Sequence, residues 1–198
     1  FLAGKGFRTL PRLYMARWLS GTSQPAPAPP TVPGIRLTRW RRFDPQLPRL
    51  LRDAYMDTPD RDASEVYSTA AGCLVYLDAL VRGEECGSFS AALSTMARDP
   101  AGRAIGFLLG TVIAKDTAHV AQVAVHPEWQ GRGVGSEILK RLLARCRGTG
   151  IRDVLLFAAR GTQEFYRRHV FEPRPSEAPG MILRAIPSSR SEDRNRSD

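Results

Sequence analysis

The stretch that decides the fold of this 198-residue chain reads Val123-Ala124-Val125-His126-Pro127-Glu128-Trp129-Gln130-Gly131-Arg132-Gly133-Val134-Gly135-Ser136. An apolar, strand-like run enters a turn with three glycines, and an amphipathic helical pattern follows the turn. The first N–H groups of a helix lack intrahelical partners and carry the positive end of the helix dipole. Because Gly131, Gly133 and Gly135 remove side chains at alternate positions, successive amides can converge on a diphosphate. The sequence therefore predicts a phosphate-binding turn between a strand and a helix.

Two common glycine-rich phosphate loops do not fit this stretch. A P-loop needs Lys followed by Ser or Thr after its last glycine, whereas Gly135 is followed by Ser136 and Glu137. A dinucleotide-binding fingerprint needs a wider spacing between its last two glycines than Gly133 and Gly135 have. Its acidic residue should also end a second strand, and Asp153 precedes its predicted strand instead. A nucleotide triphosphatase and a dinucleotide-binding domain are therefore not expected.

The stretch resembles the GNAT superfamily of acyl-coenzyme A-dependent N-acyltransferases. That signature reads Gln or Arg, two residues, Gly, one residue, then Gly or Ala, and Gln130, Gly133 and Gly135 match it. Residues 164–173 resemble the family's FYxxxGFxP segment, with Val170 where the family usually has glycine. The resemblance covers residues 35–184. It implies an α/β (α+β) fold in which helices flank a mixed, largely antiparallel central sheet whose fourth and fifth strands splay apart.

The resemblance also implies direct transfer of an acetyl group from acetyl-coenzyme A, as co-substrate, to a primary amine of a small molecule or a protein. No metal is expected. The pantetheine arm would lie along the main chain of the strand that enters the turn. The predicted cofactor-binding residues are Val123, Ala124, Val125, Gln130, Gly131, Arg132, Gly133, Val134, Gly135 and Ser136.

Two residues are candidates for proton transfer. Tyr166 lies where the family often places a tyrosine near the cofactor sulfur, and a phenol of pKa about 10 stays protonated at neutral pH. It is the predicted proton donor, and its alternative role is that of a core aromatic. His119 is the candidate base because histidine titrates near neutrality. Its alternative role is that of a hydrogen-bonded strand residue.

Gln122 stands where the family often has a carboxylate, and an amide cannot accept the proton of the acceptor amine. Strand alternation predicts that His119 and Gln122 lie on opposite faces. The missing carboxylate leaves an alternative function open, that of a catalytically weak coenzyme A sensor or scaffold.

Composition narrows the class of protein. The formal charge is +9, but much of the excess lies in residues 1–42 and no nucleic-acid-binding motif is found, so nucleic-acid binding is not expected. The three cysteines lack metal-ligand spacing, which favours a reducing compartment and a cytoplasmic protein. No apolar run reaches about 18 residues, so no transmembrane helix is expected. A homodimer is left open.

The domain is predicted to span residues 35–186. Residues 1–34 are expected to be a disordered or processed extension that ends in a Pro-rich linker, and residues 187–198 a disordered tail. Because residues 1–20 are basic and apolar without acids, organelle targeting through them is left open. Periodicity and turn residues predict strands at residues 35–40, 93–97, 104–112, 118–125, 154–158 and 181–186, and helices at residues 44–54, 64–81, 133–148 and 163–169.

Overall fold

The computed structural model describes residues 13–19, 32–58, 61, 65–83 and 86–174. Its strands are β1 (Leu13–Trp18), β2 (Arg36–Arg39), β3 (Ser88–Arg98), β4 (Ala104–Ala114), β5 (Thr117–Val125), β6 (Asp153–Ala158) and β7 (Glu172–Pro173). Its helices are α1 (Leu47–Tyr55), α3 (Ala70–Arg82), α4 (Val134–Gly148) and α5 (Gln163–Arg167), with 3₁₀ turns η2 (Glu65–Ser68) and η3 (Pro127–Trp129).

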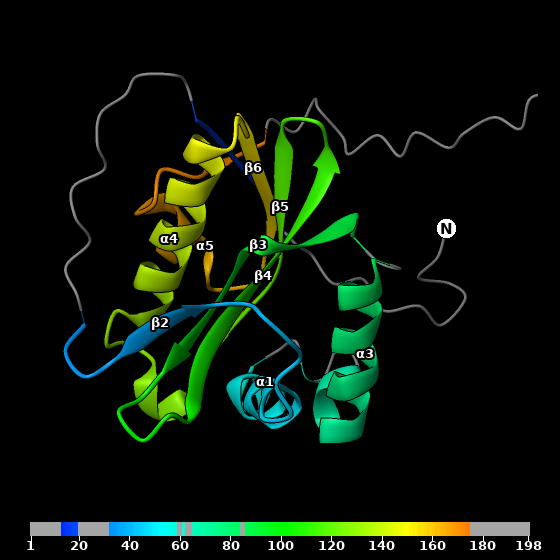
Figure 1. Cartoon of the computed structure of the whole chain (residues 1–198), viewed down its shortest axis with the longest axis vertical. Helices are drawn as coiled ribbons and strands as arrows, with labels where there is room; N and C mark the ends of the chain where they lie inside the picture. The colour runs from blue at the N-terminus through cyan, green and yellow to red at the C-terminus, as the bar shows by residue number, and fades with distance from the viewer. Residues whose placement is uncertain (1–12, 20–31, 59–60, 62–64, 84–85, 175–198) are drawn as a thin grey trace, which may run out of the picture.

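The strands form one seven-stranded sheet in the order β2-β3-β4-β5-β6-β1-β7. All neighbouring strands are antiparallel except β5 and β6, which are parallel. Helices α1 and α3 cover one face of the sheet, and α4 and α5 cover the other (Figure 1). This arrangement confirms the predicted α/β (α+β) fold with a mixed, largely antiparallel sheet flanked by helices.

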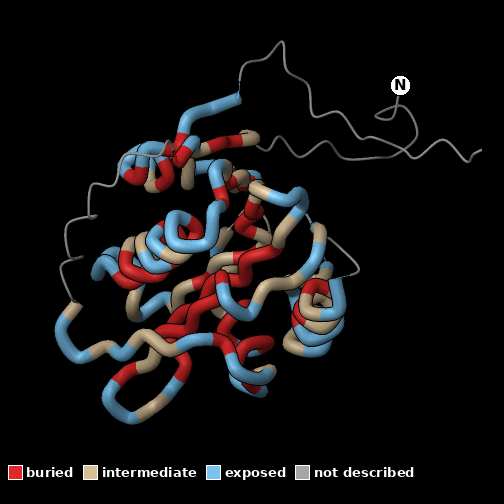
Figure 2. Tube along the Cα trace, turned by 45° about the horizontal axis from the view of Figure 1, so that its top comes forward, coloured by how far each residue is buried: buried red, intermediate tan, exposed pale blue. Residues whose placement is uncertain are grey.

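Each face of the sheet carries its own apolar core. Under α4, the side chains of Ile138 and Leu142 are fully buried against the sheet. On the other face, Leu51 of α1 and Leu77 of α3 are fully buried against Phe107 of β4. Figure 2 shows that the buried stretches follow the central strands, whereas the helices are buried along one side only. The helical apolar spacing seen in the sequence therefore packs both helix layers onto the sheet.

Strand β1 differs from the sequence prediction, which starts the domain at Ile35. Residues 13–18 pair with both β6 and β7, so part of the expected N-terminal extension lies inside the sheet. Met15 is fully buried and Leu19 is 8% exposed. The reason is non-local: the β1 segment is short and a Pro-rich stretch separates it from the domain, so its pairing with β6 and β7 is seen only in the structure.

The central strands β5 and β6 separate part of the way along. Their parallel pairs run from Thr117↔Asp153 to Val120↔Leu156, whereas both strands continue beyond these pairs. A bulge accompanies the separation: Leu109 pairs with Gln122 and Gly110 with Val120, which leaves Ala121 as an extra residue in β5. The predicted splay of the central strands is confirmed.

Most remaining elements agree with the sequence prediction. The helix expected at residues 64–81 is divided into η2 and α3, because the Thr69 side chain caps α3 by accepting a hydrogen bond from the Gly72 amide. The strand expected at residues 181–186 and the tail at residues 187–198 lie outside the described residues. Within the described ranges, no helix has both the length and the apolar character that a membrane span requires.

Val170 holds the turn between α5 and β7 in a left-handed backbone conformation, with φ 60°. A β-branched residue in this region is strained by about 1–2 kcal/mol, and the side chain is 62% exposed, so it gains little from burial. We therefore expect Val170→Gly to stabilise the fold by about 1 kcal/mol, as measured by urea unfolding. Val170→Ala removes the branch but keeps the Cβ and should recover only part of the gain. A Val170→Gly variant that is less stable than the parent would contradict this account.

Candidate functional site

The turn before α4 presents unpaired amide groups. Helix α4 begins after Gly133, which adopts a left-handed conformation with φ 89°, and no side chain caps the helix. The first bond into the helix runs from the Glu137 amide to the Gly133 carbonyl (3.0 Å). Within the described residues, no amide of residues 131–136 donates to a backbone carbonyl outside helix α4. These amides therefore remain available to an anion at the positive end of the helix.

Neighbouring side chains hold this turn in place. Gln130 Nε2 donates a hydrogen bond to the Val125 carbonyl (3.0 Å), which ties the start of the turn to the end of β5. Ser136 Oγ and His169 Nε2 share a hydrogen bond (3.0 Å), which ties the first turn of α4 to the end of α5. Arg132 stacks over the Trp129 ring, with its guanidinium carbon 5.4 Å from the ring centroid.

Some of the predicted cofactor-binding residues have side chains that are buried in the cores. The side chains of Ala124 and Val134 are buried in the cores, so only their main chain can face a ligand. The His126 amide donates to the Ile105 carbonyl (2.9 Å) on the β4 side. Because amides alternate along a strand, those of Val123 and Val125 point the other way, into the gap between β5 and β6.

Tyr166 lies on α5 among aromatic rings. Its centroid is 5.0 Å from that of Phe165 and 5.9 Å from that of Phe171, and the residue is 6% exposed. Burial raises the pKa of Tyr166 to about 12, so the hydroxyl keeps its proton at any physiological pH. No described residue forms a hydrogen bond with this hydroxyl, so its donor capacity is free for a ligand.

His119 is buried without a polar partner. The residue is 5% exposed, and neither Nδ1 nor Nε2 has a hydrogen bond among the described residues. Its nearest aromatic neighbour is Phe157, at 5.9 Å between centroids. Burial lowers the pKa of His119 to about 4, so the ring is neutral at pH 7 but is a weak base.

The predicted placement of His119 and Gln122 on opposite faces is wrong. Ala118 and Val120 belong to the core under α4, so His119 between them points to the opposite face. Gln122 points to that opposite face as well, because its side chain contacts α1 and α3. The extra residue Ala121 shifts the alternation by one position and brings both side chains to the face that α1 and α3 cover.

Sequence reasoning missed a tyrosine cluster around Gln122. Gln122 Nε2 donates to the Tyr55 hydroxyl (2.7 Å), and the Tyr76 hydroxyl donates to Gln122 Oε1 (3.2 Å). Tyr67 stacks on Tyr55 at 4.3 Å and meets Tyr76 edge-on at 5.8 Å. Burial raises the pKa of Tyr76. The polar groups described here beside Gln122 are uncharged, and only the fold brings α1, η2, α3 and β5 together.

His169 was also missed, because the sequence shows it only as a residue at a helix end. It is 8% exposed and contacts both Ser136 and the Phe165 ring (5.2 Å). Burial lowers the pKa of His169, and the nearby charges of Lys140, Arg17 and Arg168 lower it further. A neutral His169 therefore braces the Tyr166 helix against the turn before α4.

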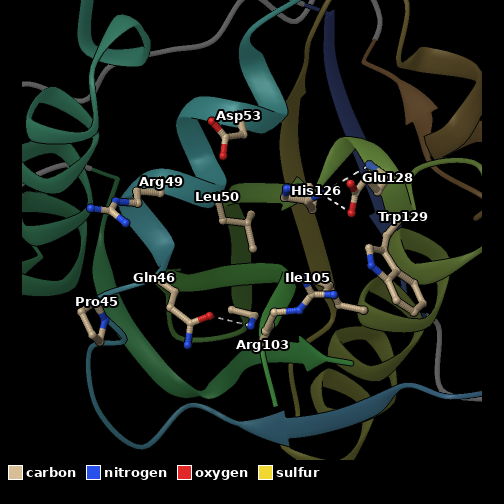
Figure 3. A pocket seen from close by; sticks show the side chains of 11 residues that line it. Pro45, Gln46, Arg49, Leu50, Asp53, Arg103, Ile105, His126, Glu128 and Trp129 are labelled. Atoms are coloured by element: carbon tan, nitrogen blue, oxygen red, sulfur yellow. Dashed lines mark hydrogen bonds and ion pairs between the residues drawn. The ribbon is translucent and has the colours of Figure 1, made fainter. Parts of the chain in front are cut away.

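A pocket of about 550 Å³ lies between α1 and the exit of β5. Figure 3 shows Asp53 and Arg49 on α1 on one side and His126 and Trp129 on the other. Arg103 and Glu128 complete the charged part of its lining. The pocket therefore offers both signs of charge next to the turn before α4.

The described residues contain no His, Cys, Asp or Glu cluster that could hold a metal ion. Burial raises the pKa of the Cys73 thiol to about 11 and that of the Cys146 thiol to about 12. Both stay protonated at neutral pH and are unsuited to nucleophilic chemistry.

Known proteins resemble this chain in sequence and in fold. The sequence matches the acetyltransferase (GNAT) family over residues 47–171. A relative in Oryza sativa subsp. japonica, serotonin N-acetyltransferase 2, chloroplastic, is 33% identical over 91 residues, which cover 46% of this chain and 46% of the rice protein. The matched region therefore spans about half the length of that relative.

Solved structures share the fold. A GCN5-related N-acetyltransferase from Sphaerobacter thermophilus superposes with a TM-score of 0.57 at 25% identity. The match covers 87% of this chain and 51% of the Sphaerobacter chain. A GNAT family acetyltransferase from Brucella melitensis, solved in complex with acetyl-CoA, has a TM-score of 0.52 at 21% identity. That match covers 71% of this chain and 91% of the Brucella chain.

The unpartnered His119 predicts a loss of stability in acid. Because its folded-state pKa of about 4 lies below the ordinary value, the unfolded chain binds a proton more readily. The stabilising effect of the neutral ring is complete above about pH 6.5 and is lost as the pH falls toward 4. We expect His119 to account for about 2–3 kcal/mol of lost unfolding free energy between pH 7 and pH 4.5. In urea unfolding at both pH values, the non-titrating variant His119→Gln should lose correspondingly less; equal losses in both proteins would contradict the prediction.

Proposed function

The chain belongs to the acetyltransferase (GNAT) family, and on that premise we propose that it transfers an acetyl group from acetyl-coenzyme A directly to a primary amine. One observation carries the proposal: the free amides of residues 131–136 lie at the end of β5, where β5 and β6 have separated. A diphosphate fits the free amides, and the thin, extended pantetheine arm fits the gap between β5 and β6.

Two parts of the co-substrate have a proposed binding group in the chain. The amides of the turn from Gly131 to Ser136 would hold the diphosphate, with Arg132 beside them. The main chain of Val123 and Val125 would hold the extended arm in the gap. Acetyl-coenzyme A would supply an acetyl thioester, which is an activated acyl group. A donor set of backbone amides suits an anion and needs no metal.

Tyr166 is the proposed proton donor. Its hydroxyl has no described partner, and its raised pKa of about 12 keeps the proton available throughout the physiological range. Transfer of that proton to the leaving sulfur would complete the acyl transfer. His169 and Phe165 act as positioning residues, because they fix α5 against the turn that binds the diphosphate.

The acceptor amine would approach from the face covered by α1 and α3. His119 and Gln122 both point to that face, and Tyr55 and Tyr76 fix the Gln122 amide. His119 remains the candidate proton acceptor, although a pKa of about 4 makes it a weak base at neutral pH. We propose a small-molecule or protein amine as acceptor. The rice relative's name directs the first assays to serotonin.

We propose a cytoplasmic location for the reaction. Cleavage of residues 1–20 as a targeting peptide would remove β1, whose residue Met15 is fully buried in the core under α4. The rice relative is chloroplastic by name, so import with β1 retained is the alternative.

Gly135→Glu tests the binding turn. Gly135 has an ordinary backbone conformation, and an added Cβ would lie 3.4 Å from the Phe165 ring, so the fold should survive. The new carboxylate would oppose the diphosphate, and we expect affinity for acetyl-coenzyme A to fall at least about 100-fold in calorimetric titration.

The matched control is Gly148→Glu. It introduces the same charge at the other end of α4, where a Cβ would meet no atom within 4 Å. This variant should bind like the parent. Parental affinity in Gly135→Glu would remove the turn from the binding site.

Tyr166→Phe tests the proton donor. If the hydroxyl protonates the leaving sulfur, kcat should fall about 100-fold while the Kd for acetyl-coenzyme A stays the same. The ring contacts with Phe165 and Phe171 are retained in the variant, so its melting temperature should not change. Unchanged turnover would reduce Tyr166 to a packing residue.

The second candidate function is a coenzyme A sensor or scaffold, and Gln122 in place of a carboxylate favours it. A screen of amines for release of free thiol separates the two functions. A transferase releases coenzyme A with at least one class of amine. A sensor binds acetyl-coenzyme A with the same affinity and releases none.

A further inference from the structure

Strand β1 occupies a place that its position in the sequence does not explain. It immediately precedes β2 along the chain, yet β2 is the first strand of the sheet and β1 is the sixth. At about 4.8 Å between neighbouring strands, the two lie about 24 Å apart across the sheet. The linker between them, residues 19–35, can span that distance, since an extended residue covers about 3.3 Å. The length of the linker therefore does not decide whether β1 joins the sheet of its own domain or the sheet of another unit.

The sequence shows what β1 follows. Residues 1–7 read Phe-Leu-Ala-Gly-Lys-Gly-Phe and match the FYxxxGF pattern at Phe1, Gly6 and Phe7. Residues 165–171 match the same pattern with Val170 in the place of Gly6. The first copy is followed by β1 and the second by the strand predicted at residues 181–186. The chain therefore carries the pattern that ends this fold twice.

The structure pairs the strand of the first copy with the second copy. β1 is antiparallel to β6 on one side and to β7, which directly follows Phe171, on the other. The Arg17 guanidinium donates to the His169 carbonyl, and the Arg174 amide donates to the Tyr14 carbonyl (2.9 Å). The slot between β6 and β7 thus receives a closing strand from the other end of the chain.

Side chains as well as the main chain fit β1 to this slot. Met15 is fully buried in the core under α4, where Leu19 also packs. On the other face, the Tyr14 ring contacts Phe157 at 4.9 Å and lies under the Arg174 guanidinium at 5.1 Å. Main-chain pairing provides affinity in such strand addition, and the pockets for alternate side chains provide selectivity.

We propose that residues 1–19 are the closing segment of another unit of this fold, and that the slot between β6 and β7 is the interface at which one unit completes the sheet of the next. The Sphaerobacter thermophilus structure leaves room for a second unit of this size, because the match covers 87% of this chain but only 51% of that longer chain. The partner is therefore a GNAT-like unit that delivers a β1-type strand, and the slot is its docking site.

Two matched substitutions test which strand closes the sheet. Met15→Asp places a charge in the core under α4 and should lower the melting temperature of the full chain by about 10 °C. Leu183→Asp changes the strand predicted at residues 181–186, which would compete with β1 for the slot, and should shift the melting temperature by less than about 2 °C. Hydrogen exchange supplies a second measurement, in which the amides of residues 14–16 should be as protected as those of β6. A large effect of Leu183→Asp with none of Met15→Asp, or unprotected amides at residues 14–16, would overturn the proposal.

A peptide experiment tests whether another unit can deliver the strand. A protease site is inserted between residues 26 and 27, the chain is cut, and it is refolded from urea with an excess of labelled peptide of residues 8–19. We expect saturable uptake of this peptide and at least about 100-fold weaker uptake of the same peptide with Met15→Asp. No uptake of the unmodified peptide would show that the slot accepts only its tethered strand and would refute the interface.

Discussion

The site depends on one constraint, the loss of pairing between β5 and β6 beyond Val120 and Leu156. A parallel pair that continued would use the amides of Val123 and Val125 within the sheet and close the gap. The bulge at Ala121 bends β5 at this point, and β4 still pairs with it on the other side, so the strand stays anchored while one edge is open. The same strand then leads through η3 into the turn that presents the amides of α4.

The outer edge of the gap needs support as well. β6 pairs with β5 over only part of its length, and β1 pairs with it along the whole of Leu13–Trp18. β1 also bonds to the segment that follows α5, the helix of Tyr166. A strand from the N-terminal end of the chain therefore holds the far wall of the site, which connects the inferred unit-to-unit interface to the geometry of the gap.

Burial sets the electrostatic character of the site. Desolvation raises the pKa of Tyr166 and lowers those of His119 and His169, so each group is neutral at physiological pH. The fixed positive character comes instead from the end of α4, which a side chain cannot titrate away. Such a site suits the anionic co-substrate of the proposed reaction, in which the phenol of Tyr166 would still carry its proton.

The sequence by itself determined the features that depend on neighbouring residues: the turn at Gly131, Gly133 and Gly135, the helix that follows it, the predicted strands of the central sheet and, by resemblance, the splay. These are local, because backbone freedom, helix dipole and apolar spacing are set within a few residues. Only the tertiary structure decided where β1 pairs, on which face His119 lies, and that Tyr55 and Tyr76 enclose Gln122. The physical reason is that strand pairing, a one-residue bulge and burial arise between distant segments, and a single sequence carries no sign of which segments will meet.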